Sequence, residues 1–454
     1  MRLTRRTGRM AAVATVALAP LVAGGWLAQS RGAREGPALL EQTMQLVASR
    51  FVDTVGAGLL YEKAARGLVK ELNDPYSELF TPKQIADFTR NTNGRYAGLG
   101  MEITAPQNGY VTVARVFQHS PAEGAGVQEG DRIAGVDTTA TKGFTSTQVQ
   151  NLLLGQPGTP VTVRFLRPGV SQPIVARLNR AIIHVPAVPF SVVLDGTVGY
   201  VPVQRFNETT AQEIADGLRS LERQGAKSVV LDLRGNGGGI LDQAVATSNL
   251  FLRRGQEILS QRGRQGESQV YVATEAPLAP TIPMVVMTDG GTASASEIVA
   301  GALQDHRRAI VLGVKSFGKG SVQTVMPIPG QGAIRLTTAR YYTPSGRSIQ
   351  ATGIEPDIEV LAQREQATAN IPRERESDLR RALRNEGNVQ QPAGAAIPPL
   401  QLPAGIAERV TRLPGEGAPA FDPAKPETDF QLQQATQLLR NLASAQGPGR
   451  RAAR

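Results

Sequence analysis

The sequence predicts a multidomain protein of mixed α/β class, in the broad sense that includes α+β domains. Apolar runs at Gly196–Val203, Ser228–Leu233 and Met284–Met287 have the composition of strands, and a helical stretch, Thr209–Gln224, separates the first two. Strands that alternate with helices are typical of a core sheet covered by helices. A chain of 454 residues has room for two or three domains. The composition changes beyond residue 361, where the Pro-, Gly- and Ala-rich stretch Asn388–Gly417 indicates a linker.

The first 30 residues have the pattern of an export segment. Four arginines within residues 2–9 precede an uncharged stretch, Met10–Ser30, that is rich in Ala, Val and Leu. A basic region followed by an apolar region is typical of a secretory signal. The stretch is also long enough to stay as a single membrane anchor, so its cleavage is left open. In either case we expect the rest of the chain beyond the membrane, either in the cell envelope (periplasmic or membrane-anchored facing outward) or secreted.

Composition excludes several kinds of site. Cysteine is absent, which excludes disulfides, cysteine catalysis and thiolate metal sites. No cluster of His, Asp and Glu has metal-ligand spacing, so we predict neither a metal nor a cofactor. The formal net charge is +10, but aromatic residues make up only 5% of the chain and do not alternate with basic runs. A solvated basic surface is therefore favoured over nucleic-acid binding.

Ser294 is the candidate nucleophile. The apolar run Met284–Met287 predicts a buried strand, Asp289–Gly291 breaks it, and apolar residues then recur with helical spacing from Ile298. A serine at such a strand–turn–helix junction lies near the unpaired N–H groups at the start of the helix. These groups can stabilise an oxyanion. Ser296 is the second candidate.

Lys319 is the candidate base for this serine. The chain has three histidines, His119, His184 and His306, and none lies in a triad pattern. The last of them is interpreted as a solvated residue at a helix end. Lysine is the other known partner of a catalytic serine, and Lys319 lies in the glycine-flanked segment Phe317–Ser321. Burial would lower its pKa and supply a neutral amine, although a solvated lysine in a surface turn would have the same local sequence.

Three longer motifs surround these two residues. They are Thr-Ala-Ser-Ala-Ser-Glu-Ile (292–298), Phe-Gly-Lys-Gly-Ser-Val-Gln (317–323) and Thr-Thr-Ala-Arg-Tyr-Tyr-Thr-Pro-Ser-Gly (337–346). In order and spacing they closely resemble the carboxyl-terminal processing peptidases, or tail-specific proteases, which are serine peptidases with a Ser/Lys dyad. The resemblance implies that Ser294 is the nucleophile, that Lys319 is the general base and that Gln323 orients the lysine.

A glycine-rich turn forms a second candidate element of the site. The run Arg-Gly-Asn-Gly-Gly-Gly (234–239) follows a predicted strand and precedes a helix from about Leu241. Such a turn could cradle phosphate, but no Walker lysine follows it. The family resemblance instead places it at the oxyanion hole, where Gly238 or Gly239 would donate an N–H alongside Ala295. The choice between the two glycines stays open, and a tight turn without a ligand is the alternative.

Residues 95–180 resemble a PDZ domain. Gly-Leu-Gly-Met at 98–101 matches the carboxylate-binding loop, and Ser-Pro-Ala-Glu-Gly-Ala-Gly-Val at 120–127 with Gly-Asp-Arg-Ile at 130–133 match the downstream pattern. Successive backbone N–H groups at Leu99, Gly100 and Met101 would bind a terminal carboxylate, and the peptide would add as a strand. The positive charge of Arg95 either attracts the terminal carboxylate or is simply solvated.

The resemblance divides the chain into five segments. They are a signal peptide or membrane anchor at 1–30, a helical N-terminal segment at 36–94, the PDZ domain at 95–180, a mixed α/β Ser/Lys peptidase core at 181–360, and a tail with linker and helices at 361–454. In the helical N-terminal segment an apolar stripe runs through Leu39, Leu40, Met44 and Val47. Such a stripe is more often core than an oligomer interface. In the tail we expect helices at 374–386 and 428–445.

The function implied by the resemblance is that of an envelope serine endopeptidase. It would recognise protein C-terminal tails through its PDZ domain and cleave peptide bonds with Ser294 activated by Lys319. The alternative is a non-enzymatic PDZ scaffold or adaptor in the cell envelope. The expected partners are protein or peptide substrates with accessible C-termini. An adaptor protein and a homo-oligomer are kept as hypotheses, and nucleic acid is not expected.

Overall fold

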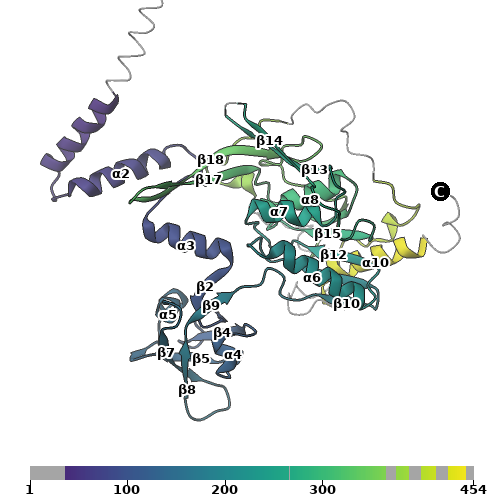
Figure 1. The fold of residues 1–454 in the computed structure, drawn as a ribbon, viewed down its shortest axis with the longest axis horizontal. Coiled ribbons are helices and arrows are strands. Elements are labelled where there is room, and N and C mark those ends of the chain that lie inside the picture. The colour runs from purple at the N-terminus through teal and green to yellow at the C-terminus, as the bar shows by residue number, and fades with distance from the viewer. Residues whose placement is uncertain (1–35, 265, 364–374, 388–399, 416–427, 446–454) are drawn as a thin grey trace, which may run out of the picture. The chain divides into compact units, whose positions relative to one another are not determined.

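The computed structural model describes residues 36–264, 266–363, 375–387, 400–415 and 428–445 (Figure 1). The predicted export segment at 1–30 lies outside the described residues, as do parts of the predicted linker. The chain divides into two compact units, Met1–Asn73 and Asp74–Arg454.

In the described part of the first unit, residues 36–50 are helical and α2 spans Ala57–Lys70. The predicted apolar stripe is largely exposed: the exposed fraction is 68% for Leu39, 49% for Leu40 and 37% for Val47. The interpretation of this stripe as core is therefore wrong for this unit. Among the residues with described positions, no helix is both long enough and apolar enough to cross a membrane.

The second unit begins with a short strand inside the segment for which the sequence predicts helices. β1 (Glu78–Phe80) pairs antiparallel with β18 (Gly332–Tyr342). α3 (Pro82–Asn93) follows, beginning with a capping box at Thr81 and ending at Gly94, whose φ of 69° suits glycine. The paired strands lie more than 250 positions apart in the chain (257 for one facing pair), so no local pattern could reveal the pairing.

The predicted PDZ segment forms a module with its own core. Its sheet runs in the order β3-β4-β5-β7-β8 with antiparallel neighbours. The elements are β3 Met101–Ile103, β4 Val111–Val116, β5 Arg132–Val136, β6 Thr139–Ala140, β7 Pro160–Leu166, β8 Ile174–Asn179, α4 Pro121–Gly124 and α5 Ser146–Leu153. β2 (Arg95–Gly98) pairs with β9 (Ala181–His184) beside it. Val111, Ile133 and Phe165 are fully buried in one cluster, which holds the module together.

A second sheet forms the centre of the remaining chain. It has the order β10-β11-β12-β15-β16-β19, in which β10 is the antiparallel edge and the other neighbours are parallel. The strands are β10 Val192–Leu194, β11 Val198–Pro202, β12 Ser228–Asp232, β15 Met284–Thr288, β16 Ile310–Gly313 and β19 Ile358–Glu359. The prediction of a mixed α/β fold is confirmed.

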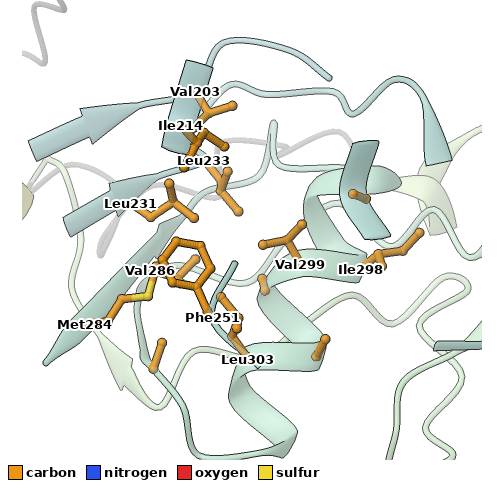
Figure 2. Packing of buried hydrophobic residues seen from close by; sticks show 14 of the residues in the cluster. Val203, Ile214, Leu231, Leu233, Phe251, Met284, Val286, Ile298, Val299 and Leu303 are labelled. Atoms are coloured by element: carbon orange, nitrogen blue, oxygen red, sulfur yellow. The ribbon is translucent and has the colours of Figure 1, made fainter. Parts of the chain in front are cut away.

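Helices cover both faces of this sheet (Figure 1). Helices α6 (Thr210–Arg223), α7 (Leu241–Asn249) and α8 (Ala295–Asp305) pack on one face, and α10 (Phe430–Ala445) packs on the other. Leu231 and Val286 join Ile298, Val299 and Leu303 of α8 in the first layer (Figure 2), whereas Val230 and Val285 face α10. Successive side chains of a strand point to opposite faces, so two covered faces require a continuous apolar run.

A third sheet lies beside this core and follows directly after the loop that contains the candidate lysine. Its order is β1-β18-β13-β14, and β17 also pairs with β18. The bounds are β13 Glu257–Gly263, β14 Ser268–Val272 and β17 Ser321–Ile328. β17 begins two residues after Lys319, so the pairing of β17 with β18 fixes the end of the lysine loop.

The tail differs from the prediction in one element. The helix predicted at 428–445 is confirmed as α10, but the described part of the segment predicted at 374–386 contains only a short 3₁₀ turn, η1 (Glu376–Asp378). Glu376 is fully buried and bonded to other segments. These contacts hold the backbone in an irregular course without an α-helix, which charged-residue spacing did not predict.

The packing of α10 leads to a test of stability. We expect Leu439→Ala to lower the free energy of unfolding by about 2–5 kcal/mol, because it empties a fully buried position beside the sheet. Gln437→Ala, on the exposed side of the same helix, is the matched control and should change it by at most about 0.5 kcal/mol. Urea unfolding followed by circular dichroism measures both, and equal effects would contradict the packing of α10 on the sheet.

Candidate active site

Ser294 lies at the junction between β15 and α8 with a strained backbone. Its φ is 57° and its ψ is −116°, and the helix begins at the next residue. A positive φ is uncommon for a residue with a side chain, and such positions cluster at functional sites. The phenol of Tyr341 lies beside the Ser294 hydroxyl. Ser296, the second candidate, is buried and donates its hydroxyl to the Asn236 carbonyl at 2.9 Å, which is a structural contact.

The glycine-rich turn lies directly against the nucleophile. A Cβ added at Gly238 would lie 2.7 Å from the Ala293 carbonyl oxygen and 2.9 Å from the Cβ of Ser294, and φ there is 95°. Only glycine fits so close an approach. The Gly238 N–H donates to Asn236 Oδ1 at 2.9 Å. In the part of the chain that the structure describes, the N–H groups of Gly239 and Ala295 have no recorded protein acceptor.

A buried carboxylate links the serine to the lysine loop. Glu297 is 0% exposed and accepts the backbone N–H of Ser294 at 2.8 Å. It also accepts the Ser316 hydroxyl at 2.6 Å and the N–H groups of Gly318 and Lys319 at 2.7 and 2.8 Å. Burial raises the pKa of Glu297 to about 7, and these hydrogen bonds oppose the rise. Sequence reasoning missed this residue, although a serine followed by a glutamate three positions later is the signal of a capping box.

Lys319 is largely buried, and its amine contacts an aromatic ring. Burial lowers the pKa of Lys319, whereas the nearby Glu376 carboxylate raises it. Its Nζ lies 3.9 Å from the ring centroid of Tyr76. The Tyr341 hydroxyl donates to the Lys319 carbonyl. Within the described residues no hydrogen bond between Lys319 Nζ and the Ser294 hydroxyl is recorded.

Gln323 lies on β17, close to the lysine in sequence. Its Nε2 donates to Ser321 Oγ at 2.9 Å and to Thr337 Oγ1 at 3.2 Å. Neither contact reaches the lysine amine, so the orienting role of Gln323 stays a prediction.

An ion-pair network anchors the glycine-rich turn. The Arg234 guanidinium is almost fully buried and contacts Asp232 at 2.6 Å and Asp429 at 3.1 Å. Asp429 directly precedes α10, so the turn is tied to the last described helix of the chain. The turn is also held at Gly235, whose N–H donates to Asp289 Oδ1 at 2.8 Å. Sequence reasoning did not identify this network, because its partners lie 195 positions apart.

The predicted peptide-binding loop borders a pocket that the PDZ-like module shares with neighbouring residues of the chain, among them Val185, Pro189 and Gln204. The pocket has a volume of about 900 Å³ and is lined on this module by Tyr96, Leu99, Met101, Ile103, Gln150 and Leu154. Gly100 has a φ of 82°, and a Cβ there would lie 2.1 Å from the Cβ of Ser120. Burial raises the pKa of Tyr96 to about 12, and the nearby backbone N–H groups of Gly100 and Met101 oppose the rise. Arg95 lines the same pocket and pairs at 3.9 Å with Glu208.

The histidines have other partners. His184 pairs with Glu213 at 2.7 Å. His306 caps the end of α8, as its position in the sequence predicts. It is bonded to Gln256 and to the Glu257 carbonyl rather than freely solvated. Across the described ranges, no group of three or more His, Asp or Glu residues could hold a metal ion.

A peptide-binding module, an α/β core, a strained serine and a largely buried lysine nearby define a serine peptidase that carries its own recognition domain. Comparison with known proteins places the chain within this class. The family model described as PDZ domain matches residues 87–165, and the model of peptidase family S41 matches residues 197–360.

Individual relatives span most of the chain. A carboxy-terminal-processing protease of Bartonella bacilliformis is 38% identical over 400 residues, which cover 87% of this chain and 86% of that protein. The carboxy-terminal processing protease CtpA of Bacillus subtilis is 33% identical over 319 residues, 70% of this chain and 68% of that one. The solved photosystem II D1 C-terminal processing protease is 32% identical, covers 70% of this chain and 86% of its own, and has a TM-score of 0.43.

The chain belongs to peptidase family S41, the carboxy-terminal processing proteases. It is a serine-type endopeptidase with a PDZ domain for the C-terminal tails of its substrates.

The close approach of the glycine turn to Ser294 leads to a sharp test. We expect Gly238→Ala to lower the cleavage rate at least about 100-fold, because the new methyl group would displace the nucleophile or its N–H partners. Gly237→Ala is the matched control: a Cβ there meets no atom within 4 Å, so most of the activity should remain. Initial rates on an unfolded model protein measure both, and similar rates for the two variants would contradict the geometry.

Proposed function

We propose that this endopeptidase cleaves peptide bonds by acyl transfer to Ser294, with the neutral amine of Lys319 as general base. The observation that carries the proposal is the Glu297 carboxylate, which binds the backbone N–H groups of both residues and so holds them in one constellation. The reduced pKa of the buried lysine further supports the assignment.

The chemical steps use only groups of this chain, the substrate and water. The Lys319 amine takes the Ser294 hydroxyl proton as Oγ bonds to the scissile carbonyl carbon. The carbon–nitrogen bond then breaks, and the departing amine receives that proton. Water, deprotonated by the same amine, releases the acyl group and restores the hydroxyl.

The oxyanion formed in these steps needs two N–H donors. We assign them to Ala295 and Gly239, whose N–H groups have no recorded acceptor among the described residues. The Gly238 N–H is already bonded to Asn236, so this glycine provides space beside the nucleophile rather than a donor. Such donors are effective because they are fixed before the charge develops.

Substrate tails would bind beside β3. The terminal carboxylate meets the backbone at Leu99, Gly100 and Met101, and the peptide adds to the sheet edge while its side chains enter the pocket. The phenol of Tyr96 lies near the N–H groups of Gly100 and Met101, so a bound tail would displace it. The alternative function, a non-enzymatic PDZ scaffold, is not favoured, because the chain belongs to a peptidase family and retains both Ser294 and Lys319.

The dyad is tested by removing each member. Ser294→Ala and Lys319→Ala should each fold and cleave an unfolded protein at least about 1000-fold more slowly than the parent chain. Matched controls are Ser296→Ala and Lys315→Ala, whose hydroxyl and amine serve structural contacts and whose loss should leave most of the activity. A Lys319→Ala variant that still cleaves well would show that another group is the base.

The pH dependence follows from the direction of the lysine shift. Burial lowers the pKa of Lys319, and only its neutral form can accept the proton. Activity should therefore rise with pH through neutrality into the mildly alkaline range. A flat cleavage rate from about pH 5 to 9 in a protein that stays folded would contradict a titrating lysine base.

We propose that residues 1–30 direct the protein to the cell envelope. The support is the basic region followed by the uncharged apolar stretch. Fusion of these residues to alkaline phosphatase, which becomes active only outside the cytoplasm, tests this, and an inactive, stable fusion would contradict export.

We also propose that the protein forms a homo-oligomer through its N-terminal helices. Leu39, Leu46 and Leu68 are 68%, 61% and 69% exposed, and exposed apolar residues in such number indicate an interface. We assign this surface to a second copy of the chain rather than to an adaptor. Light scattering on the purified protein at tens of micromolar measures its mass, and a monomer would contradict the proposal.

A further inference from the structure

The amine of Lys319 packs on an aromatic ring rather than forming a hydrogen bond with the Ser294 hydroxyl. Its Nζ lies 3.9 Å from the ring centroid of Tyr76, well within the range in which an aromatic face attracts a cation. The phenol of Tyr341 meanwhile lies beside the Ser294 hydroxyl. The two groups of the dyad thus have different aromatic neighbours in this structure.

Tyr76 is held firmly in its place. Its hydroxyl donates to the carboxylate of Glu376, 300 positions later in the chain. Its backbone carbonyl accepts Arg335 Nε at 2.8 Å. The strand that follows, β1, pairs with β18. The ring is therefore fixed at both its polar tip and its backbone.

Glu376 in turn is bonded to the loop that carries the lysine. It is 0% exposed, accepts Gln350 Nε2 at 3.0 Å, and donates its N–H to the Phe317 carbonyl at 3.1 Å. Gln350 Oε1 accepts the Gly320 N–H at 3.0 Å. Both sides of Lys319 are thus tied to the segment that holds Tyr76, although the participating segments come from distant parts of the chain.

We propose that Tyr76 and Glu376 are positioning residues that hold the protonated amine of Lys319 in a resting site on the Tyr76 ring. The proposal rests on the assignment of Lys319 as the general base. On substrate binding the side chain leaves the ring and reaches the serine as the neutral amine. The backbone need not move, because the Lys319 N–H stays on Glu297.

The charges around the amine determine the direction of the expected effect. Burial lowers the pKa of Lys319, as does Arg335 on β18, whereas the carboxylates of Glu376, Asp74 and Glu297 raise it. The ring face of Tyr76 contacts the amine, and the phenol of Tyr341 lies at the Lys319 carbonyl. Loss of the ring face or of the Glu376 charge removes stabilisation of the ammonium form. Each change should therefore lower the lysine pKa and move the acidic limb of the activity profile to lower pH.

The test compares kcat/KM against pH for the full chain and four variants. Tyr76→Leu and Glu376→Gln should move the acidic limb down by about half to one pH unit. Tyr76→Phe keeps the ring, so the acidic limb of its profile should lie close to that of the parent chain. Glu386→Gln, an exposed acid of the same segment that pairs with Arg340, is the matched control and should not shift it. A merely structural role would lower kcat without moving the limb.

A direct titration separates this proposal from the assignment of the dyad. Competitive acetylation of lysines in Ser294→Ala protein, quantified by peptide mass spectrometry, reports the Lys319 pKa without any need for activity. A lower pKa in the Tyr76→Leu and Glu376→Gln backgrounds supports the resting site. An unchanged pKa in either folded variant overturns it. If Tyr76→Leu does not fold, the proposal is decided by comparing the Lys319 pKa of Glu376→Gln with that of Glu386→Gln. If Lys319→Ala protein cleaves normally, the dyad assignment fails instead.

Discussion

The carboxylate of Glu297 is the contact on which the rest of the site depends. Four donors from the serine turn and the lysine loop converge on it. Desolvation of a carboxylate is costly, and a fully buried one is tolerated only when its oxygens are satisfied. Because Ser294 and Lys319 meet this group through backbone N–H groups, their side chains remain free for chemistry. The strained φ of Ser294 is held by the same contact, which is how a fold can maintain an unfavourable backbone angle at a functional residue.

Two further buried networks extend this arrangement to distant parts of the chain. Arg234 joins the glycine turn to the start of α10 through Asp232 and Asp429. Glu376 joins the lysine loop to Tyr76. A buried arginine between two carboxylates gains from bidentate geometry but loses strongly if one partner is removed. The tail is therefore part of the active-site architecture, although the motifs that carry the chemistry end well before it.

Sequence patterns predicted the elements whose burial shows in their own residues, as in strands that helices cover on both sides. β12 and β15 are continuous apolar runs because helices cover the sheet on both sides. α10 was predictable because its apolar residues recur with helical spacing. The pairing of β1 with β18 and the burial of Glu376 could not be predicted, since both depend on partners hundreds of positions away. A charged run such as 374–386 has the composition of a helix until such a partner fixes it in another course.

The same division applies to the site. The motifs identify Ser294 and Lys319 by residue type and spacing, but they do not contain the contacts of the lysine amine, because a side chain with four rotatable bonds can reach several partners from one backbone position. Here the backbone of the lysine is fixed while its amine packs on Tyr76. In the proposed engagement of the serine, the lysine side chain rotates and loses a proton while its backbone contact with Glu297 stays in place. A rigid scaffold is therefore compatible with a catalytic pair that rests until substrate binds.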